Sequence, residues 1–379
     1  MLPGPGSLYP TSPDRVQRRP GLPVHLDERV VARVNASKVG ELIVGIVLTV
    51  CGIGLFVTAT KVALAAGWIL FFFGVLLIIF YLGAKTRGKV QTGMARLVFL
   101  GPAVILLFVG LVVPAILTTW GSFLDANGKK FVGLANYSWT FTTPDNWVFL
   151  RNTALWIIIT PLFSTALGFF LALLMDRMRR ESLPKSLIFM PMAISFVGAS
   201  IIWSLVYEYR DPSIDSEQVG LLSAVVMKLG VTDPPNWLLW EPWNNFLLMV
   251  IMIWIQTGFA LVVLSAAIKA IPMDVTEAAM LDGATGWKLL TKVTVPMIRG
   301  TLVVVLTTIA IGVLKVFDIV YTMTNGNFGT QVLANEMYAQ SFVQFDKGRG
   351  SALAVVLFLA VTPLIIYNVT QLRKEQQIR

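Results

Sequence analysis

The side chains that carry out most enzyme chemistry are scarce in this chain of 379 residues. Its one histidine, His25, lies in a proline-rich N-terminal stretch, and Cys51 is its one cysteine. This excludes catalytic histidine pairs, histidine metal sites, intramolecular disulfides and thiolate metal clusters. A run beginning at Gly83 matches the first seven positions of a phosphate-binding loop, but it lacks the final Ser or Thr and follows an apolar helix. We therefore expect no catalytic residue, no metal site and no nucleotide site in this chain.

One polar segment, residues 270–300, has a spacing that predicts structure of its own. Asp274 and Glu277 stand three residues apart, so each carboxylate could accept a hydrogen bond from a free amide at a helix start. We predict a short helix over Val275–Asp282, with Gly283 as its left-handed stop. A helix of about eight residues is marginal in water, so another surface has to stabilise it. From spacing alone, that surface is either a cleft on another protein or the chain's own helical bundle.

The elements that position this segment are membrane spans. Hydrophobic residues make up 56% of the chain and charged residues 13%, against about 25% charged in ordinary globular domains. Mean hydropathy is +0.73. A spanning helix needs about 20 mostly apolar residues. We predict an all-α membrane protein with eight transmembrane helices: Leu42–Ala59, Val62–Leu82, Leu97–Trp120, Asn152–Met175, Leu187–Tyr207, Asn245–Ile268, Thr301–Thr322 and Ser351–Leu372.

The distribution of lysine and arginine predicts the orientation of these helices. With both termini inside the cell, most of the 30 basic residues lie in cytoplasmic segments, as the positive-inside rule requires. The net charge of +9 is therefore a sign of topology, because no basic stripe with interleaved aromatic residues indicates a nucleic-acid partner. Residues 1–40 are rich in proline and have no apolar period, so we predict a disordered cytoplasmic tail, followed by an N-terminal transmembrane hairpin over residues 41–84.

The polar segment resembles the EAA loop of permease subunits of ABC importers. The family pattern is EAA, three residues, Gly, nine residues and I-x-L-P, and valines replace the Ile and Leu here. The matching residues are Glu277, Ala278, Ala279, Leu281, Asp282, Gly283 and Pro296. The resemblance extends over residues 97–379 and implies a permease core in which the segment 270–300 is the cytoplasmic coupling loop.

Three further motifs are similar to those of the carbohydrate-type subfamily: Val132–Tyr137, Arg151–Thr153 and Phe317–Tyr321. Residues Thr324–Gly329 depart from the family's T-x-G-G-P. With its additional N-terminal hairpin, the chain looks closest to the larger permease of maltose and α-glucoside importers. The resemblance implies a multi-pass subunit of the bacterial inner (plasma) membrane that carries an α-glucoside or maltose-type oligosaccharide. Phosphorylated glycerol as the cargo, and a self-sufficient secondary transporter, remain alternatives.

The resemblance also implies the partners. A second permease subunit and two ATPase subunits would complete the complex, ATP and Mg would be bound by the ATPases, and an extracytoplasmic solute-binding protein would deliver the sugar. The seven loop residues would then couple this chain to its ATPase by alternating access.

For the substrate path, five polar or small residues within the spans are candidates. Lys315 and Asp318 stand three apart in the seventh predicted span, where they could line the sugar route or form an ion pair that fixes packing. The ion pair is slightly favoured, because a neutral sugar needs hydroxyl-directed groups. Gln256 and Thr257, with Gly258 leaving room beside them, are better candidates for sugar contact.

Overall fold

The computed structural model describes residues 42–51, 70–75, 77–79, 81, 100–101, 103–176, 178–210 and 220–378. Within these residues every regular element is a helix. An isolated antiparallel bridge pairs Leu124 with Phe131. The predicted all-α class is confirmed. The chain divides into two compact units, Met1–Val112 and Val113–Arg379.

The first unit contains two apolar helices, Leu42–Cys51 and Leu70–Ile79. They pack closely through glycine, because a Cβ atom added to Gly74 would lie 2.5 Å from the amide nitrogen of Thr49. This contact agrees with a pair of adjacent helices at the predicted hairpin. The predicted tail over residues 1–40 and the residues between the two helices lie outside the described residues, so the full hairpin and the tail stay predictions.

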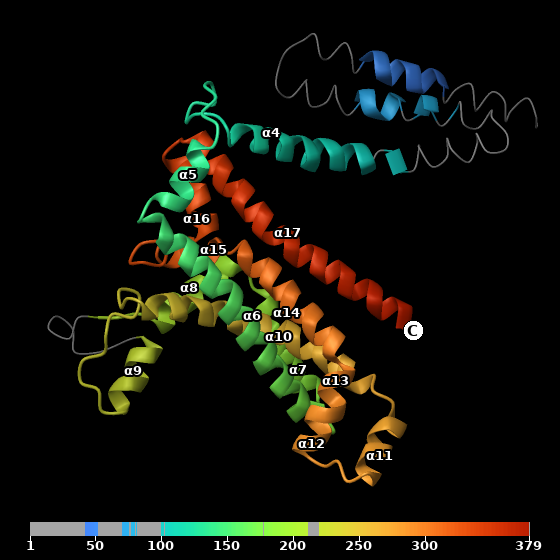
Figure 1. Cartoon of the computed structure of the whole chain (residues 1–379), viewed down its shortest axis with the longest axis vertical. Helices are drawn as coiled ribbons and strands as arrows, with labels where there is room; N and C mark the ends of the chain where they lie inside the picture. The colour runs from blue at the N-terminus through green and yellow to red at the C-terminus, as the bar shows by residue number, and fades with distance from the viewer. Residues whose placement is uncertain are drawn as a thin grey trace, which may run out of the picture. The chain divides into compact units, whose positions relative to one another are not determined.

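The second unit is a bundle of long helices (Figure 1). Its helical elements are, in chain order, α4 (Val113–Gly121), α5 (Ala135–Thr142), α6 (Asn146–Asp176), α7 (Ser182–Phe189), η2 (Met190–Ala193), α8 (Phe196–Val206), α9 (Leu221–Lys228), α10 (Trp243–Lys269), α11 (Met273–Leu281), α12 (Trp287–Leu289), η3 (Leu290–Thr294), α13 (Val295–Met297), α14 (Arg299–Leu314), α15 (Asp318–Met323), α16 (Leu333–Tyr338), η4 (Ala339–Val343) and α17 (Lys347–Ile378).

Helix α10 forms the centre of the bundle, and α6 and α14 pack on it. Leu248, Ile251 and Leu264 of α10 are fully buried. Helices α6 and α10 approach closely at Gly168, where an added Cβ would lie 2.5 Å from the Cβ of Ala260. A residue without a side chain is therefore needed at this crossing, because protein interiors leave no space for extra atoms.

Two predicted spans are broken rather than straight. The span predicted over Leu187–Tyr207 consists of Ser182–Ala193 and Phe196–Val206, whose axes differ by 104°. Ser195 stands between them and accepts a hydrogen bond from the Gly198 amide at 3.0 Å, which caps the second part. Because the side chain of Ser195 satisfies an amide at the start of α8, a new helix can begin here in a new direction.

The span predicted over Thr301–Thr322 is also wrong in its bounds. Helix α14 ends at Leu314, and α15 begins at Asp318 after a short break. At its other end α14 joins Trp287–Met297 with a bend of 70°. The described residues hold four straight spans, or six when each bent pair counts as one. The total of eight stays a prediction.

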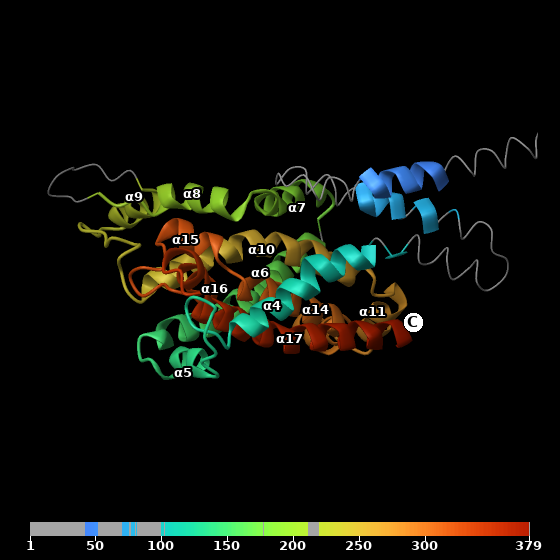
Figure 2. The same cartoon turned by 90° about the horizontal axis from the view of Figure 1, so that it is seen from above.

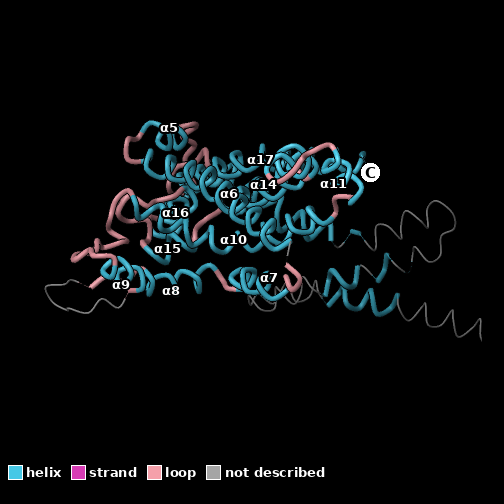
Figure 3. The backbone as a smooth tube through the Cα atoms, turned by 90° about the horizontal axis from the view of Figure 1, so that it is seen from below, coloured by secondary structure: helices cyan, strands magenta, loops and turns pink. Residues whose placement is uncertain are grey.

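The two ends of the bundle carry different elements. Helices α11 and α12 lie beyond one end, whereas α5 and α16 lie at the other (Figure 1). Helices α7 and α8 follow one another along a single side of the bundle, next to α10 and α15 (Figure 2). The same side is visible from below in Figure 3, where helices joined by loops account for the whole described tube.

Candidate functional site: the segment between α10 and α14

Helix α11 connects α10 to the segment before α14 and is nine residues long. It begins at Met273 and not at the predicted Val275, because the preceding Pro272 already stands at the N-cap position. Proline is tolerated at a helix start, where its missing amide hydrogen leaves no bond unmade. The predicted carboxylate capping is wrong, since no side chain caps this end. Asp274 lies instead in the first helical turn, where the helix dipole favours its charge.

The other end of α11 confirms the predicted left-handed stop at Gly283, whose φ is +81°. The Gly283 amide donates to the Met280 carbonyl at 3.0 Å, and the Ala284 amide donates to the Ala279 carbonyl at 2.9 Å. These two bonds form a Schellman motif, which pairs carbonyl groups that a helix end would otherwise leave free. Beyond its chain neighbours, no described atom lies within 4 Å of an added Cβ, so the backbone conformation alone requires glycine here.

The side chains of α11 are not covered by the described part of the chain. None of them is buried. Leu281 is 89% exposed and Met273 is 73% exposed, although both are large apolar residues. The other EAA residues of the helix and its C-cap are exposed or half-buried: Glu277, Ala278, Ala279 and Asp282. A short helix is marginally stable on its own, and exposed apolar side chains are typical of interaction sites. Helix α11 therefore has the properties expected of a docking surface for another molecule.

The segment after α11 extends this exposed surface toward α14. Trp287 of α12 is 75% exposed. Pro296 lies in the short helix α13, immediately before the 70° bend, and is exposed. Ile298 at the bend is only 3% exposed. The last residue of the EAA pattern therefore stands where the exposed segment turns into the bundle.

The three predicted substrate-path residues on α10 have different surroundings. Thr257 is 7% exposed and donates to the Ile253 carbonyl of its own helix at 2.7 Å. A Cβ added to Gly258 would lie 2.6 Å from the Ile188 carbonyl oxygen. The space beside Gly258 is thus filled by α7 and is not left for a solute, which corrects the prediction. Gln256 is half-buried and remains the candidate of the three.

Lys315 and Asp318 do not form the predicted ion pair. Lys315 stands at the C-terminal cap of α14, whereas Asp318 begins α15. Since the helix breaks between them, the helical spacing that would bring their side chains together is lost. Among the ion pairs of the described residues, neither residue takes part in one.

Lys315 instead borders a cavity of about 540 Å³. The cavity is otherwise lined by apolar and aromatic residues: Phe317, Ala334, Met337, Tyr338, Ala354, Leu357, Phe358 and Val361. The rings of Phe317 and Tyr338 have centroids 4.9 Å apart. Its volume lies within the usual range of ligand sites, but Asp318 and the three α10 candidates are not among its lining residues. The structure therefore does not bring the five substrate-path candidates into one site.

The sequence that forms this segment matches a known family. Residues 164–372, more than half of the chain, match the family described as "Binding-protein-dependent transport system inner membrane component". The chain belongs to this family. The matched region of the permease contains both bent spans and α11. The resemblance to importer permeases is thereby confirmed, and the family consists of transport components rather than enzymes.

Curated relatives cover most of the permease. It is 47% identical over 281 residues to "Osmoprotective compounds uptake permease protein GgtC" of Synechocystis sp. (strain ATCC 27184 / PCC 6803 / Kazusa), a match that covers 74% of this chain and 100% of that protein. It is 47% identical over 293 residues to "Alpha-glucoside transport system permease protein AglF" of Rhizobium meliloti (strain 1021), covering 77% of this chain and 86% of that protein.

The fold is shared with a solved transporter. A chain of the "Crystal structure of bacterial alginate ABC transporter in complex with alginate pentasaccharide-bound periplasmic protein" matches with a TM-score of 0.64 and 20% identity. The match covers 74% of this chain and 94% of that one. At this identity the match shows that the arrangement of helices is shared.

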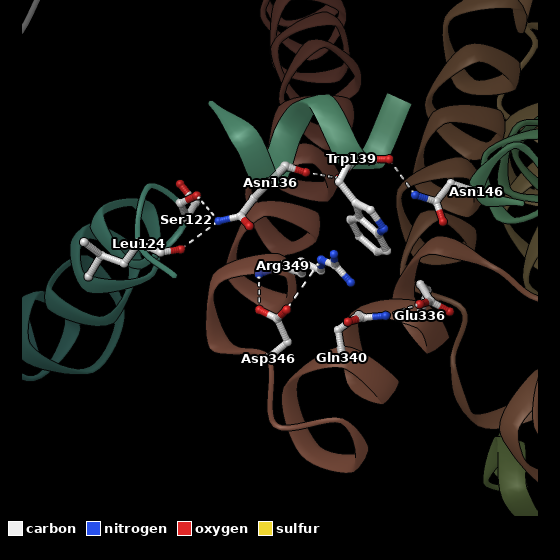
Figure 4. A network of polar contacts seen from close by, with 10 residues as sticks. Ser122, Leu124, Asn136, Trp139, Asn146, Glu336, Gln340, Asp346 and Arg349 are labelled. Carbon is white, nitrogen blue, oxygen red and sulfur yellow. Dashed lines mark hydrogen bonds and ion pairs between the residues drawn. The ribbon is translucent and has the colours of Figure 1, made fainter. Parts of the chain in front are cut away.

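At the end of the bundle away from α11, the permease holds a polar network that includes motif residues (Figure 4). Asn136, from the Val132–Tyr137 motif, donates to the carbonyls of Ser122 and Leu124 at 2.9 and 2.8 Å. Asn136 therefore ties α5 to the loop that follows α4.

Arg349 is a second centre of this network (Figure 4). Its guanidinium carbon lies 4.4 Å from the centroid of the Trp139 ring, and its Nε lies 3.4 Å from an oxygen of Asp346. A cation over the face of an indole is attracted by the ring's electrons. The contact joins α17 to α5. It could not be predicted from sequence, because the two residues are far apart in the chain.

The loop over residues 325–331 is held by buried asparagines. Asn152 donates to the carbonyls of Gly329 and Gln331 at 2.6 and 2.9 Å, and Asn244 donates to the Phe328 carbonyl at 2.7 Å. Asn152 and Asn244 are each 1% exposed. Asn244 belongs to none of the sequence motifs. The sequence feature that could have identified it is an amide side chain at the start of an apolar span, because a buried polar group there needs a hydrogen-bond partner.

Proposed function

We propose that this permease is one of two membrane subunits of an ATP-driven importer whose cargo is an α-glucoside or maltose-type oligosaccharide. The observation that carries the proposal is α11, a nine-residue helix with an 89% exposed leucine and no buried side chain. Such a helix requires a foreign surface for its stability. We assign that surface to a separate ATPase subunit, which binds ATP and Mg.

The coupling follows from differential contact. Two ATPase subunits that approach one another on binding ATP would carry α11, and its counterpart in the second permease subunit, along with them. A bundle with an inward-open and an outward-open form is then biased toward the form that fits the closed ATPases. Gly283 keeps α11 at a fixed angle to the chain that follows, and Glu277 offers an exposed charge for pairing across the interface.

The orientation of the chain completes the proposal. With both termini inside and eight spans in the bacterial inner membrane, α11 faces the cytoplasm. Lys288, Lys292 and Arg299 then lie on the inner side as well, in agreement with the positive-inside rule. The polar network around Asn136 and Arg349 faces outward, toward a solute-binding protein.

The cargo is supported by the 47% identity to a protein named as an alpha-glucoside transport permease. A relative with the same identity is named for the uptake of osmoprotective compounds, so osmoprotective compounds are the nearest competing cargo. A self-sufficient secondary transporter is disfavoured, because the family is defined by its dependence on a binding protein. Phosphorylated glycerol remains the alternative cargo for the same mechanism.

The test is ATP-driven uptake by the complete complex in proteoliposomes, with its ATPase, second permease and solute-binding protein. We expect uptake of labelled maltose-type α-glucosides and none of glycerol phosphate. Glu277→Arg is expected to abolish uptake while the protein still inserts into the membrane. Glu208→Arg, which changes an acidic residue outside the loop, is the matched control and should transport normally. Uptake that proceeds without the ATPase would contradict the mechanism, and uptake of glycerol phosphate alone would contradict the cargo.

A further inference from the structure

A carboxylate outside the EAA loop joins two helices of the bundle. Lys185 of α7 donates to one oxygen of Glu181 at 2.8 Å, and Lys269 at the end of α10 donates to the other oxygen. Lys185 also donates to the hydroxyl of Ser265 on α10, which is 2% exposed. We call these four residues the Glu181 clamp. Within the described residues, its Glu181–Lys269 pair is the ion pair that connects distant parts of the chain.

The surroundings of Glu181 favour the charged form of its carboxyl. Hydrogen bonds from Lys185 and Lys269 lower the pKa of the Glu181 carboxyl below its ordinary value. Glu181 is the N-cap residue of α7, and Lys269 lies in the last turn of α10. A negative charge at a helix start and a positive charge at a helix end both complement the helix dipoles. The Glu181 carboxyl is therefore ionised at neutral pH.

A second contact fastens α7 to α10 farther along both helices. The backbone of Ile188 and Phe189 lies against Gly258, where an added Cβ would be 2.6 Å from the Ile188 carbonyl oxygen. The contacts follow an antiparallel order, since residues later in α7 touch residues earlier in α10. Helix α7 has only eight residues and no buried side chain, so these contacts with α10 give it a fixed position.

The place of the clamp in the chain suggests what it transmits. Lys269 is the last residue of α10, and α11 begins at Met273. On the other side of the clamp, α7 leads into the 104° break, and α8 then packs on α15. The clamp thus lies between the helix that docks on the ATPase and a broken span of the bundle.

We propose that the Glu181 clamp is the joint through which movement of α11 reaches the broken span α7–α8, so that α7 and the end of α10 move as one body. This inference rests on the proposed coupling role of α11. In it Glu181 is a positioning residue, because it touches neither the cargo nor the ATPase. Without the clamp, α10 would still follow the ATPase, but α7 would follow incompletely.

The first test compares Glu181→Gln with the unchanged complex in proteoliposomes. The variant keeps the size of the side chain and removes the charge. We expect the ATPase to co-purify in unchanged amount and to hydrolyse ATP, while solute transported per ATP falls about fivefold or more, the usual lower limit of coupling between sites. Glu208→Gln is the matched control: it removes a carboxylate from the local pair with Arg210, 3.5 Å apart, and should leave the ratio unchanged.

Exchanging the charges of Glu181 and Lys269 distinguishes a specific contact between α7 and α10 from a general loss of stability. Glu181→Lys alone is expected to lower the ratio of solute to ATP. Adding Lys269→Glu should restore part of it, because the pair between α7 and α10 forms again while both charges then oppose the helix dipoles. A double variant that is no better than the single one would overturn the proposal. So would a Glu181→Gln complex that keeps the full ratio.

A cross-link replaces the ionic contact of the clamp with a covalent one. On a Cys51→Ser background, Glu181→Cys and Lys269→Cys are joined by a short bifunctional thiol reagent. If α7 and the end of α10 have to move as one body, the untreated double variant has a lowered ratio of solute to ATP, and cross-linking raises that ratio. A ratio that cross-linking leaves unchanged or lowers refutes the proposal. An unchanged complex that shows no ATP-driven uptake at all would refute the proposed function instead.

Discussion

Replacement of Leu281 by alanine provides the sharpest test of how α11 works. Its side chain is 89% exposed, so in this chain it contributes almost nothing to folding. If an ATPase covers it, the substitution removes three carbon groups from the interface, each of which contributes about 0.8 kcal/mol when buried. Scaled by the exposed fraction, the loss is about 2 kcal/mol. Since about 1.4 kcal/mol corresponds to a factor of ten in affinity, Leu281→Ala should weaken ATPase binding about 30-fold.

The assay is a titration of the purified ATPase against the permease in lipid nanodiscs, with the Kd as the readout. Leu229→Ala is the matched control, because Leu229 is 80% exposed and lies outside the α10–α14 segment. Both variants should unfold at the temperature of the unchanged protein, as exposed substitutions usually change stability by less than about 0.5 kcal/mol. An ATPase affinity for Leu281→Ala equal to that of Leu229→Ala would refute the reasoning, because α11 would then not be a docking surface.

Four further predictions follow from the geometry. Gly283→Val places a branched side chain at φ +81°, at a cost of about 1–2 kcal/mol, so amide exchange in α11 should accelerate and uptake fall while membrane insertion persists. Gly168→Val sets a Cβ 2.5 Å from that of Ala260. The overpacking costs about 1–3 kcal/mol and should lower the melting temperature. Gly110→Val is the control and should not lower it, because no neighbouring atom of the described residues lies within 4 Å of a Cβ added to Gly110. Asn152→Ala leaves the carbonyls of Gly329 and Gln331 without their donor. The loop should lose about 1–3 kcal/mol of stability, and its amide hydrogens should exchange faster. An unchanged exchange rate would contradict this prediction. The pKa of Glu181 is lowered in the folded state, so the stabilisation that its ionised carboxyl provides is complete above the ordinary value of 4.5 and is lost only as the pH falls below it. The ratio of solute to ATP should therefore be constant between about pH 6 and 8. A decline within that window would contradict an ionised Glu181.

The sequence was sufficient to place α11 and its stop, because both depend on local chemistry. Gly283 adopts the left-handed conformation that few other residues tolerate, so its position could be read directly. The start of α11 was missed by two residues, since a proline at the N-cap made carboxylate capping unnecessary. Hydropathy likewise located the apolar runs, which form the long helices of the bundle.

Bends and contacts between distant helices could not be predicted in the same way. Hydropathy is unchanged when a span turns by 104° at Ser195, although a capping serine and a nearby proline were present as weak signals. The break after Leu314 has no proline or glycine within it, and it separates Lys315 from Asp318. Gly258 seemed to leave space because its neighbour Ile188 is 70 positions away in the chain, and only the fold brings the two together.

The motifs around Asn136 and Asn152 also explain why family resemblance and cargo are separate questions. The side-chain amides of Asn136 and Asn152 donate to backbone carbonyls, so they hold loops in place whatever the solute is. The loop over residues 325–331 departs from the family pattern, yet it is fixed by the same means: Phe328 has a φ of +55°, rare for an aromatic residue, and Asn244 binds its carbonyl. Since these two motif asparagines hold loops in place, they do not by themselves indicate the cargo. Phe328, which is 46% exposed, and half-buried Gln256 lie outside the three motifs.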